Sequence, residues 1–223
     1  ILSIAGIDGN GQSELVEALT GLNPSDEGQI VLRGQEISKR SIRYRNINGL
    51  AHIPEDRHKH GLILDYSLEE NLILKRYFTK KFAPSGFIRT SVARPFANKL
   101  ISEFDIRSGE GAKTKARSMS GGNQQKAIIA REIDTDHNVL IAVQPTRGLD
   151  VGAIEYIHNQ LISEREAGKA ILLVSFEIDE VMDISDRILV MYEGKITADL
   201  DPKTTTVNDL GLYMAGSKRS VAE

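Results

Sequence analysis

The chain has 223 residues, 40% of them apolar, and a formal net charge of −3 at pH 7. This length and composition suit a globular, soluble protein with one α/β domain, or a core with a smaller subdomain, and the charge excludes the basic footprint of a nucleic-acid partner. No apolar run approaches the roughly 20 residues that cross a bilayer, and the absence of cysteine excludes disulfides and thiolate metal sites, which suits the cytoplasm.

The first residues read as a buried strand that leads into a helix. Ile1–Ala5 is mostly apolar, residues 13–20 have helical spacing, and Gly21 stands where glycine commonly follows a helix C-terminus. Because residue 1 lies inside an apolar strand and not in a charged leader, we see no secretory signal and interpret the chain as a fragment. Two short strands are predicted next, at residues 29–33 and 50–53.

The middle of the chain reads as helical. Between about residues 62 and 126 strand signals disappear, and two or three amphipathic helices are predicted, interrupted by Pro84, Gly86 and Pro95. We interpret this region as a helical subdomain inserted into the domain.

The alternation of strands and helices then resumes. The strand "NVLIAV" is followed by a helix at residues 151–166, the strand "AILLVS", a short acidic helix and a strand pair that turns at Glu193–Gly194. The pattern predicts an α/β fold class, with a mostly parallel sheet in a P-loop core. We divide the single domain into a core at residues 1–60 and 127–200, a helical subdomain at 61–126, and a polar tail at 201–223 that frays after about Pro202.

The segment "GIDGNGQS" between the first strand and helix reads like a phosphate-binding loop. Its glycines let main-chain N–H groups surround phosphate oxygens, the helix N-terminus favours anions, and Ser13 offers a hydroxyl to magnesium. Gln12 occupies the usual lysine position, so a hydrogen bond of about 1 kcal/mol replaces a charge-assisted one of about 1.5–3 kcal/mol. The alternative is a strand-to-helix turn whose glycines serve packing alone. The candidate nucleotide-binding residues are Gly6, Asp8, Gly9, Asn10, Gly11, Gln12, Ser13 and Glu14.

A second candidate anion site is the segment "SGGNQQK". Two glycines before a helix-forming run expose main-chain N–H groups at a helix N-terminus, and Ser120 either caps this helix or donates to a phosphate. A simple capped helix start is the alternative. The candidate binding residues here are Ser120, Gly121, Gly122 and Gln124.

In combination, these motifs resemble the nucleotide-binding domain of an ATP-binding cassette (ABC) transporter over nearly the whole chain. Residues 6–13 match the Walker A loop, 120–124 the signature motif, 139–144 the Walker B strand and 148–150 the D-loop. More narrowly, "GIDGNGQSEL", "IPEDR", "SGGNQQK" and "QPTRGLDVGA" are similar to the second cassette of the fused double-cassette proteins that drive bacterial importers of simple sugars and nucleosides. The first of these segments favours the nucleoside branch.

The chain departs from this family where hydrolysis takes place. The family's Walker B strand ends in Asp-Glu, where the Asp holds the water shell of magnesium and the Glu polarises the attacking water, but this chain has Val143 and Gln144. Phe176 replaces the histidine expected at the γ-phosphate, and Glu55 stands where a glutamine usually contacts magnesium. With Gln12, these differences imply that ATP and magnesium bind weakly or not at all at this site and that hydrolysis there is weak or absent.

One alternative for this site and one expectation about the fold follow from the residues and the resemblance. If Ser13 holds magnesium together with Glu55 or Asp56, slow turnover survives. The family also has two strands and an aromatic residue that stacks on adenine before the phosphate loop, and we expect these N-terminal antiparallel strands to be absent or truncated in this chain.

The resemblance also implies partners. In this family two cassettes close head to tail, and each ATP site combines one Walker A loop with the partner's signature motif. Ser120, Gly121 and Gly122 would then act in the site of a second cassette, the first half of the same polypeptide. Transmembrane permease subunits would hold the chain peripherally on the cytoplasmic face of the cell membrane. The resemblance places Glu55, Asp56 and Arg57 in the region that faces the permease, with a plain charged turn as the alternative, and places the D-loop residues Gly148, Leu149 and Asp150 at the cassette interface.

Some alternatives remain open from the sequence. The chain can be a self-sufficient ABC-type ATPase, or a dimerisation and docking module that binds no nucleotide. His58 and His60 have no third ligand nearby, so we interpret them as solvated surface and not as a metal site. Arg147 and Asp150 are predicted either to form an ion pair or to cap the helix that follows them.

Overall fold

The structure is a computed structural model in which residues 1–218 are described. Its contacts divide the chain into two compact units. The first, here called the sheet unit, consists of Ile1–His52, His137–Gln144 and the residues from His158 onward, and the second, the helical unit, consists of Ile53–Asp136 and Pro145–Ile157. Within the described residues, no helix is long and apolar enough to cross a membrane.

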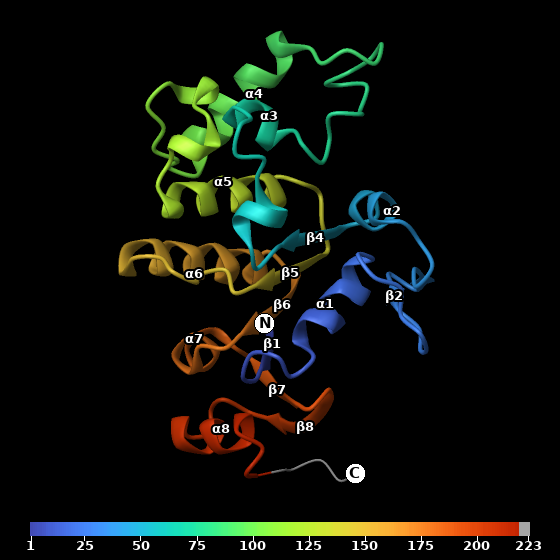
Figure 1. Ribbon diagram of the computed structural model, residues 1–223, viewed down its shortest axis with the longest axis vertical. Helices are drawn as coiled ribbons and strands as arrows, with labels where there is room; N and C mark the ends of the chain where they lie inside the picture. The colour runs from blue at the N-terminus through green and yellow to red at the C-terminus, as the bar shows by residue number, and fades with distance from the viewer. Residues whose placement is uncertain (219–223) are drawn as a thin grey trace. The chain divides into compact units, whose positions relative to one another are not determined.

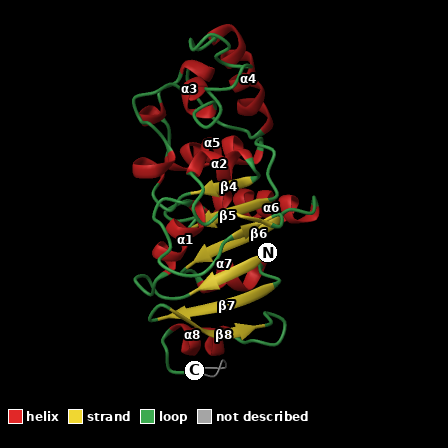
Figure 2. Cartoon of the chain, turned by 90° about the vertical axis from the view of Figure 1, so that its right-hand side faces the viewer, coloured by secondary structure: helices red, strands yellow, loops and turns green. Residues whose placement is uncertain are grey.

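The sheet unit is built on a six-stranded sheet with the strand order β4-β5-β6-β1-β7-β8 (Figure 2). Strands β5, β6, β1 and β7 run parallel to one another, and β8 is antiparallel to β7. In the register, Ser3 of β1 lies opposite Leu173 of β6 and Ile188 of β7. The strands are β1 Leu2–Ala5, β4 Leu50–Ile53, β5 Val139–Val143, β6 Ala170–Ser175, β7 Arg187–Tyr192 and β8 Lys195–Leu200.

Helices cover both faces of this sheet (Figure 1). Because strand side chains alternate, Ile4 joins the apolar cluster under α1, Gln12–Thr20, while Ala5 joins the cluster under α7, Ile178–Ile184, and α8, Val207–Met214. The mostly parallel α/β fold with inserted helices is confirmed. Strand β4, helix α6 (Val151–Glu166) and strand β6 begin and end at the predicted residues.

The prediction that the chain frays after about Pro202 is wrong for residues 207–214. They form α8, which Thr206 caps by accepting a hydrogen bond from the main-chain nitrogen of Asp209 at 3.1 Å. Leu210, Tyr213 and Met214 are buried in the apolar cluster against β7. Their i, i+3, i+4 spacing makes the segment amphipathic, and its burial outweighs the polar composition around it. The last part of the predicted tail, residues 219–223, lies outside the described residues.

A short segment after α1 supports the C-terminus of that helix. The predicted strand at residues 29–33 is reduced to β2, Val31–Leu32, which pairs with β3, Gln35–Glu36. Helix α2, Ile42–Ile47, was not predicted, and its buried Arg45 donates to the carbonyl oxygens of Ala18 at 2.7 Å and Leu19 at 2.6 Å. A cation on the last carbonyl groups of a helix satisfies acceptors that have no intrahelical partner.

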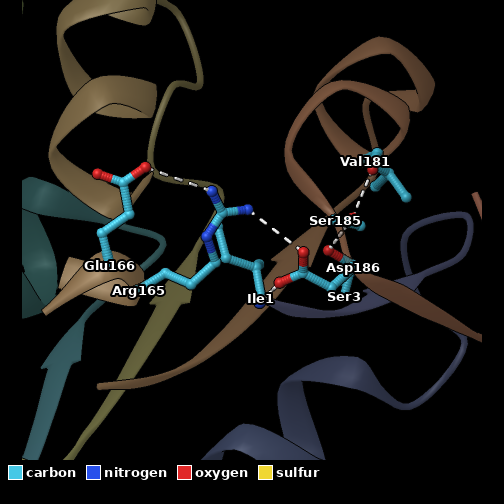
Figure 3. Close-up of polar contacts among 7 residues, drawn as sticks. All are labelled: Ile1, Ser3, Arg165, Glu166, Val181, Ser185 and Asp186. Carbon is cyan, nitrogen blue, oxygen red and sulfur yellow. Dashed lines mark hydrogen bonds and ion pairs between the residues drawn. The ribbon is translucent and has the colours of Figure 1, made fainter. Parts of the chain in front are cut away.

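Polar contacts tie the beginning of β1 to its neighbours (Figure 3). Asp186 binds the main-chain nitrogen of Ile1 and accepts a hydrogen bond from Arg165 at 3.3 Å. Next to it, the hydroxyl groups of Ser3 and Ser185 lie 2.5 Å apart, and Ser185 donates to the carbonyl of Val181. These contacts fix the amino end of β1, whereas the phosphate loop follows the carboxyl end of the same strand.

The helical unit consists of short helices joined by loops. Its elements are the π-helical turn η1 Arg57–Gly61, helices α3 Leu68–Leu72, α4 Thr90–Glu103 and α5 Gly121–Ile133, the 3-10 turns η2 Gly111–Lys113 and η3 Ala116–Ser118, and the first residues of α6. The predicted break at Pro95 is wrong, because α4 continues through it. Pro95 is exposed and is the sixth residue of α4, so the helix continues past it with one main-chain hydrogen bond fewer.

A buried ionic network connects the elements of this unit. Glu132 of α5 binds Lys75 at 2.6 Å and Arg131 at 2.9 Å, and Arg131 also donates to the carbonyl of Gly61 at 2.8 Å. Burial alone would raise the pKa of Glu132, but the charges of Lys75 and Arg131, with their hydrogen bonds, lower it to about 2 from its usual 4.5. Helix α5 is thereby held to the end of η1.

Candidate functional site

The phosphate-binding loop follows β1 at the carboxyl edge of the parallel strands. Gly9 and Gly11 have left-handed φ values of 86° and 102°, which other residues adopt only with strain. No described side chain caps the N-terminus of α1. The loop therefore has the backbone form of an anion site, in which N–H groups and the helix dipole favour phosphate.

Gln12, which stands at the usual lysine position, folds into the loop itself. Its side-chain oxygen accepts a hydrogen bond from the main-chain nitrogen of Asn10 at 3.1 Å, and its side-chain nitrogen donates to the carbonyl of Ile7 at 3.2 Å. Only 2% of Gln12 is exposed. The oxygen of Gln12 thus occupies one of the main-chain N–H groups of the loop.

The loop has little spare room around this side chain. A Cβ atom at Gly6 would collide with the side chain of Gln12 and would lie 2.5 Å from the carbonyl oxygen of Met191. Gly6 does not have a left-handed φ, so the requirement for glycine here is steric. The neighbouring Ser13, Glu14 and Asp8 are exposed, and Ser13 presents a hydroxyl group to solvent.

Asn10 fastens the loop to the turn between β7 and β8. Its side-chain oxygen accepts from the main-chain nitrogen of Glu193 at 2.8 Å, and its carbonyl accepts from that of Gly194 at 2.9 Å. Its side-chain nitrogen donates to the carbonyl of Ile7 at 2.9 Å. The predicted turn at Glu193–Gly194 is confirmed, and its left-handed φ values are 49° and 75°. Its contact with the loop was not predicted, since no sequence pattern links positions so far apart.

The end of β5 carries no carboxylate. Val143 is buried in the apolar cluster on the α1 face of the sheet. Gln144 is 4% exposed, has a left-handed φ of 46°, and donates its main-chain N–H to the carbonyl of Val174 at 2.8 Å. Among the described residues, the side-chain nitrogen of Gln144 is buried without a hydrogen-bond partner. A buried amide donor without a partner costs free energy, and a left-handed φ at a non-glycine residue adds strain.

Phe176 follows β6 and is partly exposed. Since β1, β5 and β6 are parallel, the residues that follow their carboxyl ends lie along one edge of the sheet. The fold therefore places Gln12, Gln144 and Phe176 along the same edge, as the motif order predicts.

These residues do not fit a magnesium ion. Magnesium prefers carboxylates and other oxygen ligands in an octahedral arrangement, but the end of β5 offers only the apolar Val143 and the neutral amide of Gln144. The described residues contain no group of three or more His, Cys, Asp and Glu side chains able to hold a metal. Glu55, the predicted second ligand beside Ser13, forms an ion pair with Arg147 within the helical unit.

The signature segment lies at the start of α5. Ser120 has the extended backbone of a helix cap, with φ −65° and ψ 155°, but its side chain does not cap the helix. Its hydroxyl oxygen instead accepts a hydrogen bond from the side-chain nitrogen of Asn123 at 2.8 Å. By contrast, Ser41, Ser67 and Thr206 all cap their helices. Among the described residues, no side chain caps the first N–H groups of α5, and the side-chain hydrogen bond of Ser120 uses its oxygen as an acceptor.

Gln124, also predicted to bind a nucleotide, is engaged inside the unit. It is buried, donates to the carbonyl of Ala116 at 2.9 Å, and its oxygen lies 2.8 Å from a ring nitrogen of His58. His58 thus contacts the signature segment and belongs to no metal cluster among the described residues.

The expected interface residues form a connected set of loops. Asp56 caps η1 by accepting from the main-chain nitrogens of His58 at 2.8 Å and Lys59 at 2.9 Å, and these bonds hold the pKa of its carboxyl below the usual value. Asp150 caps α6 by accepting from Ala153 at 2.9 Å. Of the two predicted roles, the structure therefore shows the cap.

The remaining expected interface residues lie in the same loop as Asp150. Gly148 has a left-handed φ of 69°, and Leu149 is partly exposed. Arg147, before them, forms its ion pair with Glu55 and not with Asp150.

Fold and motifs together define a nucleotide-binding cassette of the P-loop class. A sequence profile described as "ABC transporter" matches residues 1–147, and the chain belongs to this family.

The curated relatives are import proteins. The chain is 52% identical to the guanosine import ATP-binding protein NupO of Bacillus subtilis over 222 residues, which is 100% of the chain and 43% of that protein. It is 49% identical to the nucleoside import ATP-binding protein NupA of Lactococcus lactis, over 97% of the chain and 42% of that protein. It is 37% identical to the glucose import ATP-binding protein TsgD13 of Haloferax volcanii, over 100% and 40%. The chain thus spans less than half the length of these relatives.

Solved structures support the fold. The chain is similar, with a TM-score of 0.74 and 22% identity, to a dimeric post-hydrolysis state of the ATP-binding cassette MJ0796 bound to ADP and Pi, over 91% of the chain and 85% of that structure. A nucleotide-free ATP-binding cassette from an ABC transporter has a TM-score of 0.73 and 23% identity, over 90% and 80%.

Proposed function

We propose that this chain is the ATP-binding cassette of an importer for nucleosides or simple sugars, and that it is the second cassette of a fused double-cassette protein. The names of the curated relatives support the importer, and the guanosine and nucleoside proteins at 52% and 49% identity favour nucleosides. The relatives are more than twice as long as the chain, which leaves room for a first cassette.

The site at the chain's own phosphate loop is hydrolytically weak or inactive. The observation that carries this proposal is the end of β5, where a buried valine and a neutral glutamine stand in place of two carboxylates. A general base contributes about 10²–10⁴ to a rate, and an amide accepts no proton at neutral pH. The side chain of Gln12 inside the loop further opposes nucleotide binding.

The chain's contribution to catalysis is its signature motif. The N–H groups of Gly121 and Gly122 and the hydroxyl of Ser120 stabilise charge on the γ-phosphate in the site of the partner cassette. The uncapped start of α5 supports this role, because among the described residues no side chain caps these N–H groups, and Asn123 donates to the Ser120 oxygen and so leaves the hydroxyl proton available. Permease subunits hold the assembly peripherally on the cytoplasmic face of the membrane.

The test is phosphate release with magnesium and ATP. The purified chain should show little hydrolysis, and in the complete importer Ser120→Ala should reduce turnover strongly while Ser13→Ala, in the chain's own loop, should leave it nearly unchanged. Hydrolysis by the purified chain at the rate of the full importer would instead support a self-sufficient ATPase. Calorimetric titration with ATP tests the alternative that the chain is a docking module that binds no nucleotide. In that case the titration would give no heat at millimolar nucleotide, and Ser120→Ala would not change turnover.

A further inference from the structure

Arg57 lies between two segments of the helical unit, the signature segment at the start of α5 and the loop at residues 145–150. It is the first residue of η1, and its guanidinium donates to the carbonyl oxygen of Arg147 at 3.2 Å. The same group lies against the start of α5, because a Cβ atom built on Gly121 would be 3.3 Å from its Nη2 atom. A Cβ atom on Gly148 would be 3.8 Å from that nitrogen.

The guanidinium leaves little room at Gly121. A Cβ atom there would lie 3.3 Å from Nη2, 3.5 Å from Cζ and 3.8 Å from Nε of Arg57, so the end of the arginine side chain would have to shift slightly. Gly121 begins a helix with an ordinary backbone, so this contact and not a left-handed φ disfavours a side chain there.

The segment that carries Arg57 is itself firmly attached. Asp56 caps η1, His58 lies 2.8 Å from the side chain of Gln124, and the carbonyl of Gly61 accepts from Arg131 at 2.8 Å. Since these contacts reach both the first and the last turns of α5, η1 runs along that helix. Arg57 extends from a rigid base.

The other end of the contact is fixed from two sides. Glu55 forms an ion pair with Arg147, whose carbonyl accepts from Arg57. Two residues earlier, the carbonyl of Pro145 accepts from the side chain of Gln125 in α5 at 2.7 Å. The loop at residues 145–150 and the first turn of α5 are therefore joined through side chains of residues 55–57 and 125.

We propose that Arg57 is a positioning residue: its guanidinium fixes the loop at residues 145–150 against the first turn of α5 and thereby holds the signature donors in one arrangement. A planar guanidinium with five donors contacts two backbone segments at once, which a lysine ammonium on a flexible chain does not. This inference rests on the proposed function in so far as the donors at Ser120, Gly121 and Gly122 act on a phosphate in the partner's site.

The first measurement is hydrogen–deuterium exchange of the 223-residue chain. Arg57→Gln should raise exchange roughly three- to tenfold at the hydrogen-bonded amides of Gln124 and Leu149, which donate to the carbonyls of Ser120 and Thr146, and leave amides 6–13 unchanged, because the contact that restrains both segments is lost. Arg57→Lys should give an intermediate result. The matched control is Arg117→Gln, which removes the same charge three residues before Ser120 but contacts the exposed Asp65. Unchanged exchange in Arg57→Gln, or an equal rise in Arg117→Gln, would overturn the inference.

The second measurement is ATP hydrolysis by the complete importer. Arg57→Gln should lower kcat roughly tenfold with little change in KM, since mispositioned donors lose contact with charge that develops only in the transition state. Arg57→Lys should recover part of kcat, whereas an undiminished kcat in Arg57→Gln would overturn the inference. Ser120→Ala separates the two proposals: if it leaves hydrolysis unchanged, the proposed function is wrong, and the exchange experiment still decides the role of Arg57.

Discussion

Replacement of Gln12 tests whether the phosphate loop is blocked by its own side chain. In the structure, the Gln12 oxygen holds the N–H group of Asn10 and the Gln12 nitrogen holds the carbonyl of Ile7. A phosphate that binds the Asn10 N–H group must first displace the amide. We therefore expect Gln12→Ala to bind ATP more tightly than the natural chain, although it removes a polar side chain.

The magnitude follows from the two hydrogen bonds. Each neutral bond contributes about 1 kcal/mol net, so displacement of the amide costs about 1–2 kcal/mol, equivalent to a Kd roughly 5- to 30-fold weaker. Gln12→Ala should recover up to that factor. Gln12→Lys should tighten binding by at least about tenfold, because it also adds a charge-assisted bond to phosphate.

The assay is calorimetric titration of the purified chain with ATP and magnesium. The matched control is Gln29→Lys, which adds the same charge at an exposed glutamine of the sheet unit and should not change binding. Thermal unfolding checks that the variants fold, with a loss of about 1–2 kcal/mol expected for Gln12→Ala.

Two results would refute the reasoning about Gln12. Weaker binding by Gln12→Ala would mean that the amide holds the nucleotide and does not displace it. A flat titration for all variants, Gln12→Lys included, would mean that the glycine N–H groups of the loop bind no phosphate at all.

Two further predictions concern missing and buried carboxylates. Val143→Asp with Gln144→Glu, in a Gln12→Lys background, should raise magnesium-dependent phosphate release from the chain by about 10²–10⁴; no gain would contradict the role given to the missing carboxylates. Because the pKa of Glu132 is lowered to about 2 from 4.5, its contribution to stability is complete above pH 4.5 and is lost as the pH falls towards about 2. Glu132→Gln should destabilise the chain at neutral pH, and its free energy of unfolding should fall less on acidification than that of the unchanged chain. Urea unfolding of both proteins at neutral pH and at about pH 3 measures this, and an equal loss of stability in the two proteins would contradict the lowered pKa of Glu132.

Local patterns in the sequence were sufficient for the fold class and the order of the motifs. Strand β6 and helix α6 end where the change of hydrophobic period predicts. The lack of carboxylates at the end of β5 could also be predicted, because it depends only on the residue types at Val143 and Gln144. Helix α8 was missed because its few buried side chains gain their stability from β7 and α7, which no local window contains.

The direction of each polar side chain was decided only by the tertiary structure. From the sequence, Gln12 was expected to donate to a phosphate and Glu55 to contact magnesium. In the structure, Gln12 donates to the carbonyl of Ile7 in its own loop, and Glu55 forms an ion pair with Arg147. A polar side chain binds whichever partner the folded backbone brings within about 3 Å, and these partners often come from distant segments. Residue types therefore set which side-chain groups the end of β5 offers, and the packing of loops sets which partners the polar groups of this chain contact.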